Sequence, residues 1–511
     1  MFKTGLLVIS NPKKITSILS SIQKQVKNTL YIQILSALGD AQVGFQPKVF
    51  KTCPRFSKTI FGIYANAANQ CDKLDVRVLL SGIKYNISKI QTRKPIDLII
   101  FDKPYPQTEI DSFIKTRIQN ITTDFHIVTL DSDNYNVSEN EDGMPDDIYK
   151  HTVLGGTFDR LHTAHKLLLS EAALRSSEKV TVGVTEENML QSKILWELIE
   201  DIEVRVTNVS DFLKDICPEL EYNIVPISDP FGPAIVDPSM EMIVVSEETM
   251  KGGEKINSIR QERGLAPLKI FPVELMDEPN PKPIEEQKIS SSTTRIRLLG
   301  TLLKPVEPNC SISKTPYIIG LTGGIASGKS GVASHLKELG AFIINCDQLG
   351  HDVYKTGKPC HQEIVKTFGK EVLCENGEIN RQILGGIVFK NSEQMNKLNS
   401  IVWPAIAEQV KNIIKNTSAK VFVIEAAVLL SANWEKYCHE IWATTIPRRE
   451  AIIRLINRNK LTEEQANNRI DAQPSNCFYV KAAHVVFCTL WPVEYTKEQV
   501  VKAWQLMQER L

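Results

Sequence analysis

The sequence predicts an α/β protein in which two three-layer α/β/α domains with parallel sheets stand in tandem, preceded by a small α/β region. Two observations predict this fold class. From residue 150 onward, short β-rich runs alternate with segments of helical character, a pattern typical of parallel sheets covered by helices. The same alternation begins afresh after a segment at 304–316 that holds three prolines, which indicates a linker between two domains.

Length and composition limit the classes of function. A chain of 511 residues is too long for one ordinary core. Its 60 basic and 60 acidic residues balance, which argues against a nucleic-acid binder, since such proteins usually carry a basic excess. The ten cysteines are scattered and form no CxxC pair, which favours a reducing compartment. Because no apolar run reaches the ~18 residues that cross a bilayer, we expect a cytoplasmic protein with no nucleic-acid partner and no transmembrane segment.

Residues 1–145 are expected to form an α/β region whose role the sequence does not indicate. Strand-like runs lie at 6–9, 76–80 and 97–102. The polar, acidic stretch at 131–147 is typical of a linker. Residues 1–39 contain five lysines and no acidic residue. Two interpretations of this start remain open: a first strand followed by a surface helix, or a mitochondrial address with peripheral mitochondrial association.

The next domain is expected at 146–303 and contains LGGTFDRLHTAHKLLL, in which a strand ends at Gly155-Gly156 and a helix begins with His162 and His165. Its strand-like runs lie at 152–156, 180–184, 222–227, 242–247 and 268–273. The two histidines are three residues apart and share a helix face. Backbone N–H groups, the helix dipole and both imidazoles would then converge on polyphosphate oxygens. A structural histidine pair and a metal pair remain open, although a metal site needs three or four ligands.

A third domain is expected at 317–511, with strands at 317–322, 341–345, 421–426, 440–446 and 484–490. More than 70 residues separate the second of these strands from the third, which predicts an inserted, mostly helical subdomain. GGIASGKS follows the first strand and precedes a helix, which is the context of a phosphate-binding P-loop. The loop residues expected to contact nucleotide are Gly323, Gly324, Ile325, Ala326, Ser327, Gly328, Lys329 and Ser330.

Several side chains of this domain are expected to bind phosphate or metal or to accept a proton. Lys329 is expected to bridge the β- and γ-phosphates of ATP, and Ser330 to hold Mg²⁺. Asp347 follows the second strand, at the sheet edge where ligands bind, and could accept a proton from an attacking hydroxyl; a helix N-cap is the alternative. Arg454 and Arg458 share a helix face. With Arg469 they predict an arginine-rich lid over ATP, against the alternative of a solvated basic helix.

These motifs carry a resemblance. GLTGGIASGKS, INCDQLGH, EAAVLL and the R-x₃-R…R-x₃-Q segment are similar to the dephospho-coenzyme A kinase family over about residues 316–511. The resemblance implies that ATP phosphorylates the ribose 3′-hydroxyl of dephospho-CoA, with Asp347 as the catalytic base. The chain departs from the family at Asn345, where D-x-D is frequent, and at Glu425, where the family often has the Asp of D-x-P-L-L.

GTFDRLHTAH and the downstream ISSSTTR at 289–295 resemble two paired elements of the nucleotidylyltransferase superfamily, whose fold is Rossmann-like, with Ala164 in place of the usual glycine. Within it, residues 150–300 are similar to phosphopantetheine adenylyltransferase of the eukaryotic type, also in VGVT with Lys193 beyond it, DPFGPA and VVSEET. The resemblance implies that 4′-phosphopantetheine attacks the α-phosphorus of ATP, with Lys193 neutralising charge; a solvated surface lysine is the alternative. The nucleotide contacts expected beside His162 and His165 are Gly155, Gly156, Thr157, Phe158, Ser290, Ser291, Ser292 and Arg295.

Together the two resemblances imply a fusion that performs the last two steps of coenzyme A biosynthesis. Its substrates would be ATP, 4′-phosphopantetheine and dephospho-CoA, and its cofactor Mg²⁺. Two alternatives remain open. One is a cytidylyltransferase fused to a small-metabolite kinase, and the other is a fusion in which one degenerate half serves as a binding or regulatory module.

Overall fold

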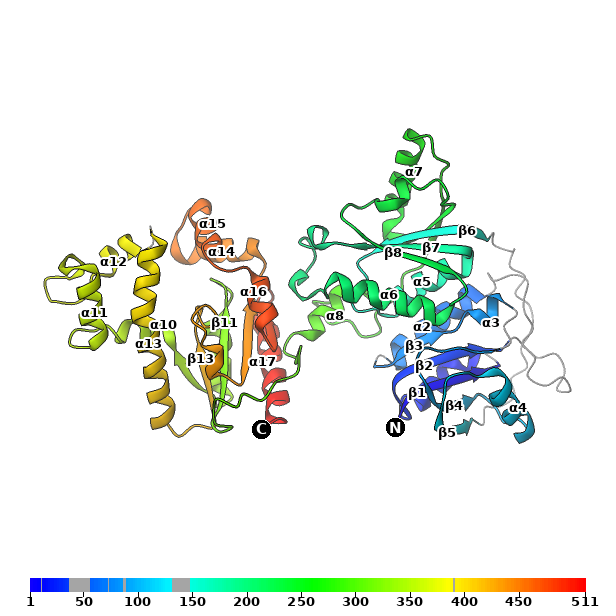
Figure 1. Ribbon diagram of the computed structural model, residues 1–511, viewed down its shortest axis with the longest axis horizontal. Coiled ribbons are helices and arrows are strands. Elements are labelled where there is room, and N and C mark those ends of the chain that lie inside the picture. Colours follow the sequence, from blue (N-terminus) through cyan, green and yellow to red (C-terminus); the bar gives the residue numbers. More distant parts are fainter. Residues whose placement is uncertain (11, 36–55, 72, 86–88, 131–147, 389–390) are drawn as a thin grey trace. The chain divides into compact units, whose positions relative to one another are not determined.

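The structure of the protein is a computed structural model that describes residues 1–10, 12–35, 56–71, 73–85, 89–130, 148–388 and 391–511 (Figure 1). It divides into two compact units, Met1–Thr294 and Arg295–Leu511, both built from parallel sheets and helices. The predicted fold class is confirmed. The acidic linker predicted at 131–147 lies outside the described residues. None of the helices within the described ranges combines the length and apolarity that crossing a bilayer requires.

The N-terminal sheet is parallel and five-stranded, in the order β3-β2-β1-β4-β5 (Figure 1). Its strands are β1 (Phe2–Ile9), β2 (Val26–Ile34), β3 (Asp75–Val78), β4 (Ile96–Phe101) and β5 (Ile121–Thr129). Its helices are α1 (Ile15–Ile22), α2 (Ser57–Gln70), α3 (Ser81–Lys84) and α4 (Gln107–Arg117). The three predicted strands correspond to β1, β3 and β4. β5 was not predicted because, as an edge strand with no fully buried residue, it carries no apolar run.

The second sheet of this unit is also parallel and five-stranded, in the order β10-β9-β6-β7-β8. All five predicted strands are present: β6 (Tyr149–Gly156), β7 (Ser176–Thr185), β8 (Glu221–Ile227), β9 (Met242–Ser246) and β10 (Lys269–Val273). Its helices are α5 (Thr163–Arg175), α6 (Ile202–Ile216), α7 (Met250–Glu262) and α8 (Ser291–Leu298), the last of which crosses the boundary between the units. β6 lies between β7 and β9, so its carboxyl end is where the strand order reverses, the usual ligand site of such sheets.

The two sheets of the first unit share one hydrophobic core. Helix α2 packs against helix α5, and the buried side chains of both belong to a single apolar cluster that also includes β1, β2, β6 and β7. Ile60 and Tyr64 of α2, and Leu169 and Ala173 of α5, are inaccessible to solvent or nearly so. Because burying such side chains is the main favourable term in folding, residues 1–130 are tied energetically to the residues around β6 and α5.

The second unit holds one parallel sheet in the order β12-β13-β11-β14-β15. The five predicted strands are present as β11 (Tyr317–Gly323), β12 (Phe342–Asn345), β13 (Val421–Glu425), β14 (Glu440–Thr445) and β15 (Val485–Cys488). The inserted helical subdomain is confirmed as α10 (Cys346–Asp352), α11 (Pro359–Phe368), α12 (Arg381–Val388) and α13 (Ser392–Asn416). The remaining helices are α9 (Lys329–Glu338), α14 (Arg448–Asn459), α15 (Glu463–Asp471), α16 (Asn476–Ala482) and α17 (Val493–Gln508).

Candidate active sites

The first candidate site lies at the turn between β6 and α5. Gly155 and Gly156 end the strand, and a Cβ added to Gly156 would lie 3.0 Å from the ring of Phe158. Phe158 and Arg160 have φ angles of +52° and +47°, which non-glycine residues rarely adopt. The chain therefore bends sharply here, and the backbone turns directly into the helix that carries the histidines.

His162 is the N-cap of α5. Its Nδ1 accepts a hydrogen bond from the backbone N–H of His165 at 3.4 Å. Because Nδ1 accepts, the proton of the neutral imidazole is assigned to Nε2, which is then a donor. The rings of His162 and His165 are stacked, with their centroids 3.8 Å apart. The predicted placement of both imidazoles at the start of the helix is therefore confirmed, and the Nε2–H of His162 is a donor there.

The serine-rich element meets this turn although it lies about 130 residues further along the chain. Ser290 Oγ accepts the backbone N–H of Thr293 at 3.1 Å and so caps α8. Ser291 Oγ lies 3.3 Å from His162 Nε2 and donates to the backbone oxygen of Asp159 at 3.3 Å. The amino-terminal ends of two helices thus converge on one place, an arrangement that favours polyphosphate.

A buried arginine supports the turn and was not predicted. Arg205 of α6 is 1% exposed, and its NH1 donates to the backbone oxygens of Thr157 and Thr185 at 2.8 and 2.9 Å. Its Nε donates to the backbone oxygen of Glu200 at 2.8 Å. Thr157 also accepts a hydrogen bond from Thr185 Oγ1 at 3.1 Å. No local motif surrounds Arg205 in the sequence, so the only signal was an arginine on the apolar side of a predicted helix.

Three other predicted contacts lie less centrally. Lys193 is exposed in the segment between β7 and α6, and Ser292 is half-buried in the first turn of α8. Arg295 is buried and is the first residue of the second unit. The contacts of all three with ATP stay predictions.

The second candidate site is the P-loop between β11 and α9. Gly323 and Gly328 have positive φ angles, and a Cβ would lie 2.4 Å from the backbone oxygen of Thr444 at the first position and 2.7 Å from Thr489 at the second. Glycine is therefore required at both positions. Lys329 Nζ donates to the backbone oxygens of Gly323 and Gly324 at 2.8 and 2.9 Å. Burial lowers the pKa of Lys329, although the negative charges of Asp347 and Glu425 act to raise it.

The two departures from the family pattern lie together beside this loop. Glu425 is the last residue of β13, the strand next to β11, and is 5% exposed. Its Oε1 accepts the hydroxyl of Ser330 at 2.8 Å, and its Oε2 accepts Asn345 Nδ2 at 3.1 Å. An aspartate at 345 could not donate this second hydrogen bond when ionised. The amide at 345 and the longer carboxylate at 425 therefore form a matched pair.

A cavity of about 780 Å³ opens over the loop. The predicted residues Asp347, Arg454 and Arg458 line it together with the loop, so the structure brings them to one place. Asn457 and Gln473 also line it. Neither was predicted to contact nucleotide, although Gln473 is the last residue of the R-x₃-Q segment; its Oε1 accepts the backbone N–H of Ile325 at 2.7 Å. The full lining is Ile325, Ala326, Ser327, Gly328, Lys329, Ser330, Gly331, Asp347, Glu425, Ala427, Arg454, Asn457, Arg458 and Gln473.

The predicted arginine lid corresponds to α14 and α15, which pack against each other. Arg454 NH1 donates to Thr489 Oγ1 at 2.8 Å and to the backbone oxygen of Ala326 at 3.3 Å, so it already contacts the loop. Arg469 is exposed on α15 and is not part of the cavity lining. Its role over ATP stays a prediction.

Comparison with known proteins assigns a family to each region. A family model described as dephospho-CoA kinase matches residues 317–488, and one described as cytidylyltransferase-like matches residues 153–298. The dephospho-CoA kinase of Carboxydothermus hydrogenoformans is 41% identical over 187 residues, which cover 36% of this chain and 91% of that protein. The dephospho-CoA kinase of Moorella thermoacetica is 38% identical over 199 residues, covering 38% of this chain and 94% of that protein.

Among solved structures, a dephospho-CoA kinase from Campylobacter jejuni is 25% identical and covers 38% of this chain and 97% of that chain, with a TM-score of 0.30. The assignment depends on the sequence relatives, which match along nearly their whole length. The family model covers the P-loop, Asp347 and both lid arginines that line the cavity over the P-loop. This chain therefore belongs, through its second unit, to the dephospho-CoA kinase family, and it carries a cytidylyltransferase-like domain in its first.

Proposed function

We propose that the chain performs the last two steps of coenzyme A biosynthesis. The first unit transfers an adenylyl group from ATP to 4′-phosphopantetheine, and the second phosphorylates the dephospho-CoA so formed. The observation that carries this proposal is the meeting of His162 and Ser291 at 3.3 Å in a chain whose second unit belongs to the dephospho-CoA kinase family. Adenylyl transfer to 4′-phosphopantetheine makes the compound after which that family is named, which favours it over other nucleotidyl transfers.

In the adenylyl transfer, a phosphate oxygen of 4′-phosphopantetheine attacks the α-phosphorus of ATP. The bond from that phosphorus to the α,β-bridging oxygen breaks, and pyrophosphate leaves. The Nε2–H of His162, the imidazole of His165 and the amino-terminal ends of α5 and α8 stabilise the charge that develops on the leaving group. No covalent enzyme intermediate is needed, because positioning and charge stabilisation supply the rate.

In the phosphoryl transfer, the ribose 3′-oxygen attacks the γ-phosphorus, the bond to the β,γ-bridging oxygen breaks, and ADP leaves. Asp347, which lines the cavity, accepts the hydroxyl proton. Lys329 exchanges the backbone oxygens of Gly323 and Gly324 for phosphate oxygens, and Arg458 faces the transferring group from the cavity wall.

The residues beside the P-loop fit Mg²⁺. The Ser330 hydroxyl and the Glu425 carboxylate lie 2.8 Å apart on the cavity wall. Such oxygens suit this ion, which proteins usually bind through one or two side chains together with substrate phosphates. Ser330 would hold the ion, and Glu425 would orient Ser330. When bound, Mg²⁺ neutralises charge on the β- and γ-phosphates.

A second candidate has a specific observation in its favour. The family model that matches residues 153–298 is described as cytidylyltransferase-like, so transfer of a cytidylyl group from CTP is the rival activity of the first unit. The distinction is one of nucleotide preference. Release of pyrophosphate from CTP faster than from ATP would favour the rival.

The test is to incubate the purified full-length chain with 4′-phosphopantetheine, ATP and Mg²⁺ and to identify the thiol products. We expect dephospho-CoA and then CoA. Lys329→Ala is expected to accumulate dephospho-CoA, since its adenylyl transfer remains. His165→Ala is expected to make no dephospho-CoA but to phosphorylate added dephospho-CoA at the wild-type rate. Loss of both activities in either folded variant would contradict the assignment of two sites.

A further inference from the structure

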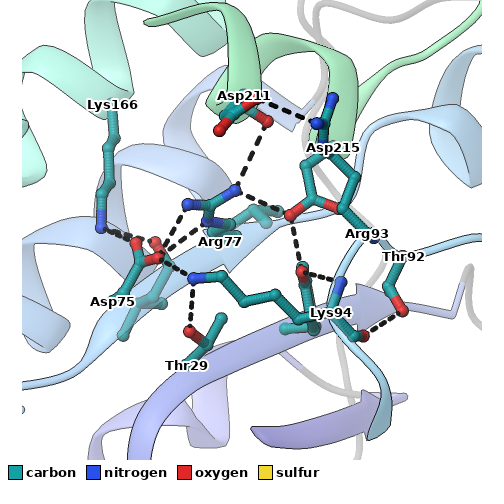
Figure 2. Close-up of polar contacts among 12 residues, drawn as sticks. Thr29, Asp75, Arg77, Thr92, Arg93, Lys94, Lys166, Asp211 and Asp215 are labelled. Atoms are coloured by element: carbon teal, nitrogen blue, oxygen red, sulfur yellow. Dashed lines mark hydrogen bonds and ion pairs between the residues drawn. The ribbon is translucent and has the colours of Figure 1, made fainter. Parts of the chain in front are cut away.

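Helix α5 is anchored from the N-terminal sheet directly behind its histidines. Lys166 follows His165 in the sequence, and its backbone N–H donates to the backbone oxygen of His162 at 3.0 Å. Its side chain runs the other way, into the first unit, where Nζ donates to Asp75 Oδ1 at 2.6 Å and to the backbone oxygen of Val76 at 3.1 Å. Figure 2 shows Lys166 reaching down from its helix to Asp75 on β3. Lys166 is 5% exposed and the side chain of Asp75 is 30% exposed, so the lysine end of this contact is sheltered from water.

Asp75 is itself held in place by further cations. Arg77 NH2 lies 2.8 Å from Asp75 Oδ2, and Lys94 Nζ lies 3.1 Å from the same oxygen (Figure 2). Burial raises the pKa of Asp75, but the charges of Lys166 and Arg77 outweigh it and hold that pKa well below its usual range. The carboxylate is therefore ionised at neutral pH, and the network presents a fixed negative charge to Lys166.

The same network reaches helix α6. Arg77 NH1 donates to Asp215 Oδ2 at 2.7 Å, and Tyr31 OH donates to the same carboxylate at 2.6 Å. Asp215 is 2% exposed. Residues of the N-terminal sheet thus bind both α5, which begins with the histidines, and α6, which carries the arginine that supports the turn (Figure 2).

We propose that Asp75 is a positioning residue for adenylyl transfer, which it serves by fixing Lys166 and, through Lys166, the two histidines. This inference rests on the function proposed for the first unit. It assigns to the N-terminal sheet a part in that activity, through contacts with α5 rather than with the reacting atoms. The physical reason is that a displacement of about 1 Å at a catalytic group can lower a rate on the order of 100-fold. A shift of Lys166 moves the backbone of the first helical turn, to which both imidazoles are attached.

The test uses Lys166→Met and Asp75→Asn in the full-length chain. Pyrophosphate release gives kcat and the KM for ATP, calorimetry gives the number of ATP molecules bound per chain, and phosphorylation of added dephospho-CoA reports on the second unit. We expect kcat for pyrophosphate release to fall by about 10- to 100-fold, with the KM for ATP within about threefold of wild type. Two ATP molecules should still bind per chain, and phosphorylation should be unchanged.

Arg93→Ala is the matched control. It removes an exposed ion pair, Arg93 to Asp211 at 3.0 Å, which joins the N-terminal region to α6 rather than to α5. Its pyrophosphate release should stay within about twofold of wild type, as exposed pairs contribute little. The double variant Asp75→Asn/Lys166→Met removes the buried lysine charge that Asp75→Asn alone leaves without its carboxylate. It should regain thermal stability but not kcat.

Three results would overturn the inference. They are a kcat for Lys166→Met within twofold of wild type, a loss of one ATP site that accounts for the whole fall in rate, and a recovery of kcat in the double variant. Each would mean that the pair contributes only to folding. A wild-type chain that releases no pyrophosphate would instead refute the function proposed for the first unit, and this inference with it.

Discussion

Glu425→Gln tests whether the departures at 345 and 425 form a working pair. Glu425 accepts one hydrogen bond from Ser330 and one from Asn345. A glutamine can still accept the Ser330 hydroxyl, but its amide then faces the amide of Asn345, donor against donor. The substitution also removes a negative charge from the wall that faces the P-loop. A hydrogen bond to a charged group contributes about 1.5–3 kcal/mol. If that amount is lost from the transition state, kcat/KM falls by about 10- to 150-fold.

The assay is ADP formation from ATP and added dephospho-CoA, with pyrophosphate release from 4′-phosphopantetheine and ATP as the internal control. Asn345→Asp alone should also lower phosphorylation, because two carboxylates would then face each other. The double variant Asn345→Asp/Glu425→Gln exchanges the positions of carboxylate and amide. It should recover part of the loss, with a coupling of about 0.5–3 kcal/mol.

Two results would refute this reasoning. If Glu425→Gln keeps its kcat/KM within twofold of wild type, the carboxylate does not support Ser330 during turnover. If the double variant is no better than the worse single variant, the contact between the two side chains is not the source of the effect. A parallel fall in pyrophosphate release would point to general unfolding instead.

Three other perturbations follow from the structure. Arg205→Met leaves the backbone oxygens of Thr157, Thr185 and Glu200 without their donor, at a cost of about 1–3 kcal/mol each. Calorimetry should show a lower melting temperature for the first unit, and pyrophosphate release should be reduced. An unchanged melting temperature would contradict the supporting role of Arg205. Arg454→Ala should lower the rate of dephospho-CoA phosphorylation at least tenfold, as expected for a group that stabilises the charge of the transferring phosphoryl group. Arg469→Ala should lower this rate less, because Arg469 is exposed and does not line the cavity. Equal losses would mean that α15 also closes over the nucleotide. Because the pKa of Asp75 is lowered in the folded state, its stabilising effect is complete above about pH 4 and is lost as the pH falls below that value. The difference in free energy of unfolding between wild type and Asp75→Asn should therefore be constant from about pH 8 to pH 5 and shrink in acid. A difference that grew in acid would contradict this sign.

The sequence predicted most of the fold because buried parallel strands are continuous apolar runs. All ten strands predicted from residue 150 onward are present, and the long gap before β13 does contain helices. β2 was not predicted, because Lys27, Asn28, Thr29 and Gln33 interrupt its apolar residues, although every position from Thr29 to Ile34 is buried. Long-range packing, which no local window contains, decides whether such a segment becomes a strand.

The candidate sites likewise contain residues that are local in the sequence, which could be predicted, and residues that only long-range packing brings together. The P-loop and the histidine turn are local in sequence, because a strand, a turn and a helix N-terminus are contiguous and form the phosphate-binding geometry by themselves. Asn457 had no such signal, since only the packing of α14 and α15 brings it to the cavity, whereas Gln473 ends the R-x₃-Q segment and was visible there without a role. Asn345 and Glu425 were each visible as departures, but their pairing depends on the register between β12 and β13, in which these two residues are direct partners.

The register between β12 and β13 explains why the departures from the family pattern at Asn345 and Glu425 are tolerated together. Direct partners on neighbouring parallel strands keep their side chains close, so a change at one alters the best residue at the other. Asp75 and Lys166 follow the same logic over 91 residues of sequence. A buried lysine without an anion would be strongly destabilising, so the burial of Lys166 depends on the carboxylate of Asp75. Because one partner lies on β3 of the N-terminal sheet and the other beside the histidines of α5, removal of residues 1–130 should take away the carboxylate that fixes Lys166 and uncover the face of α5 that packs against α2. We therefore expect the N-terminal sheet to be a structural requirement of the proposed adenylyl-transfer site rather than an appended module.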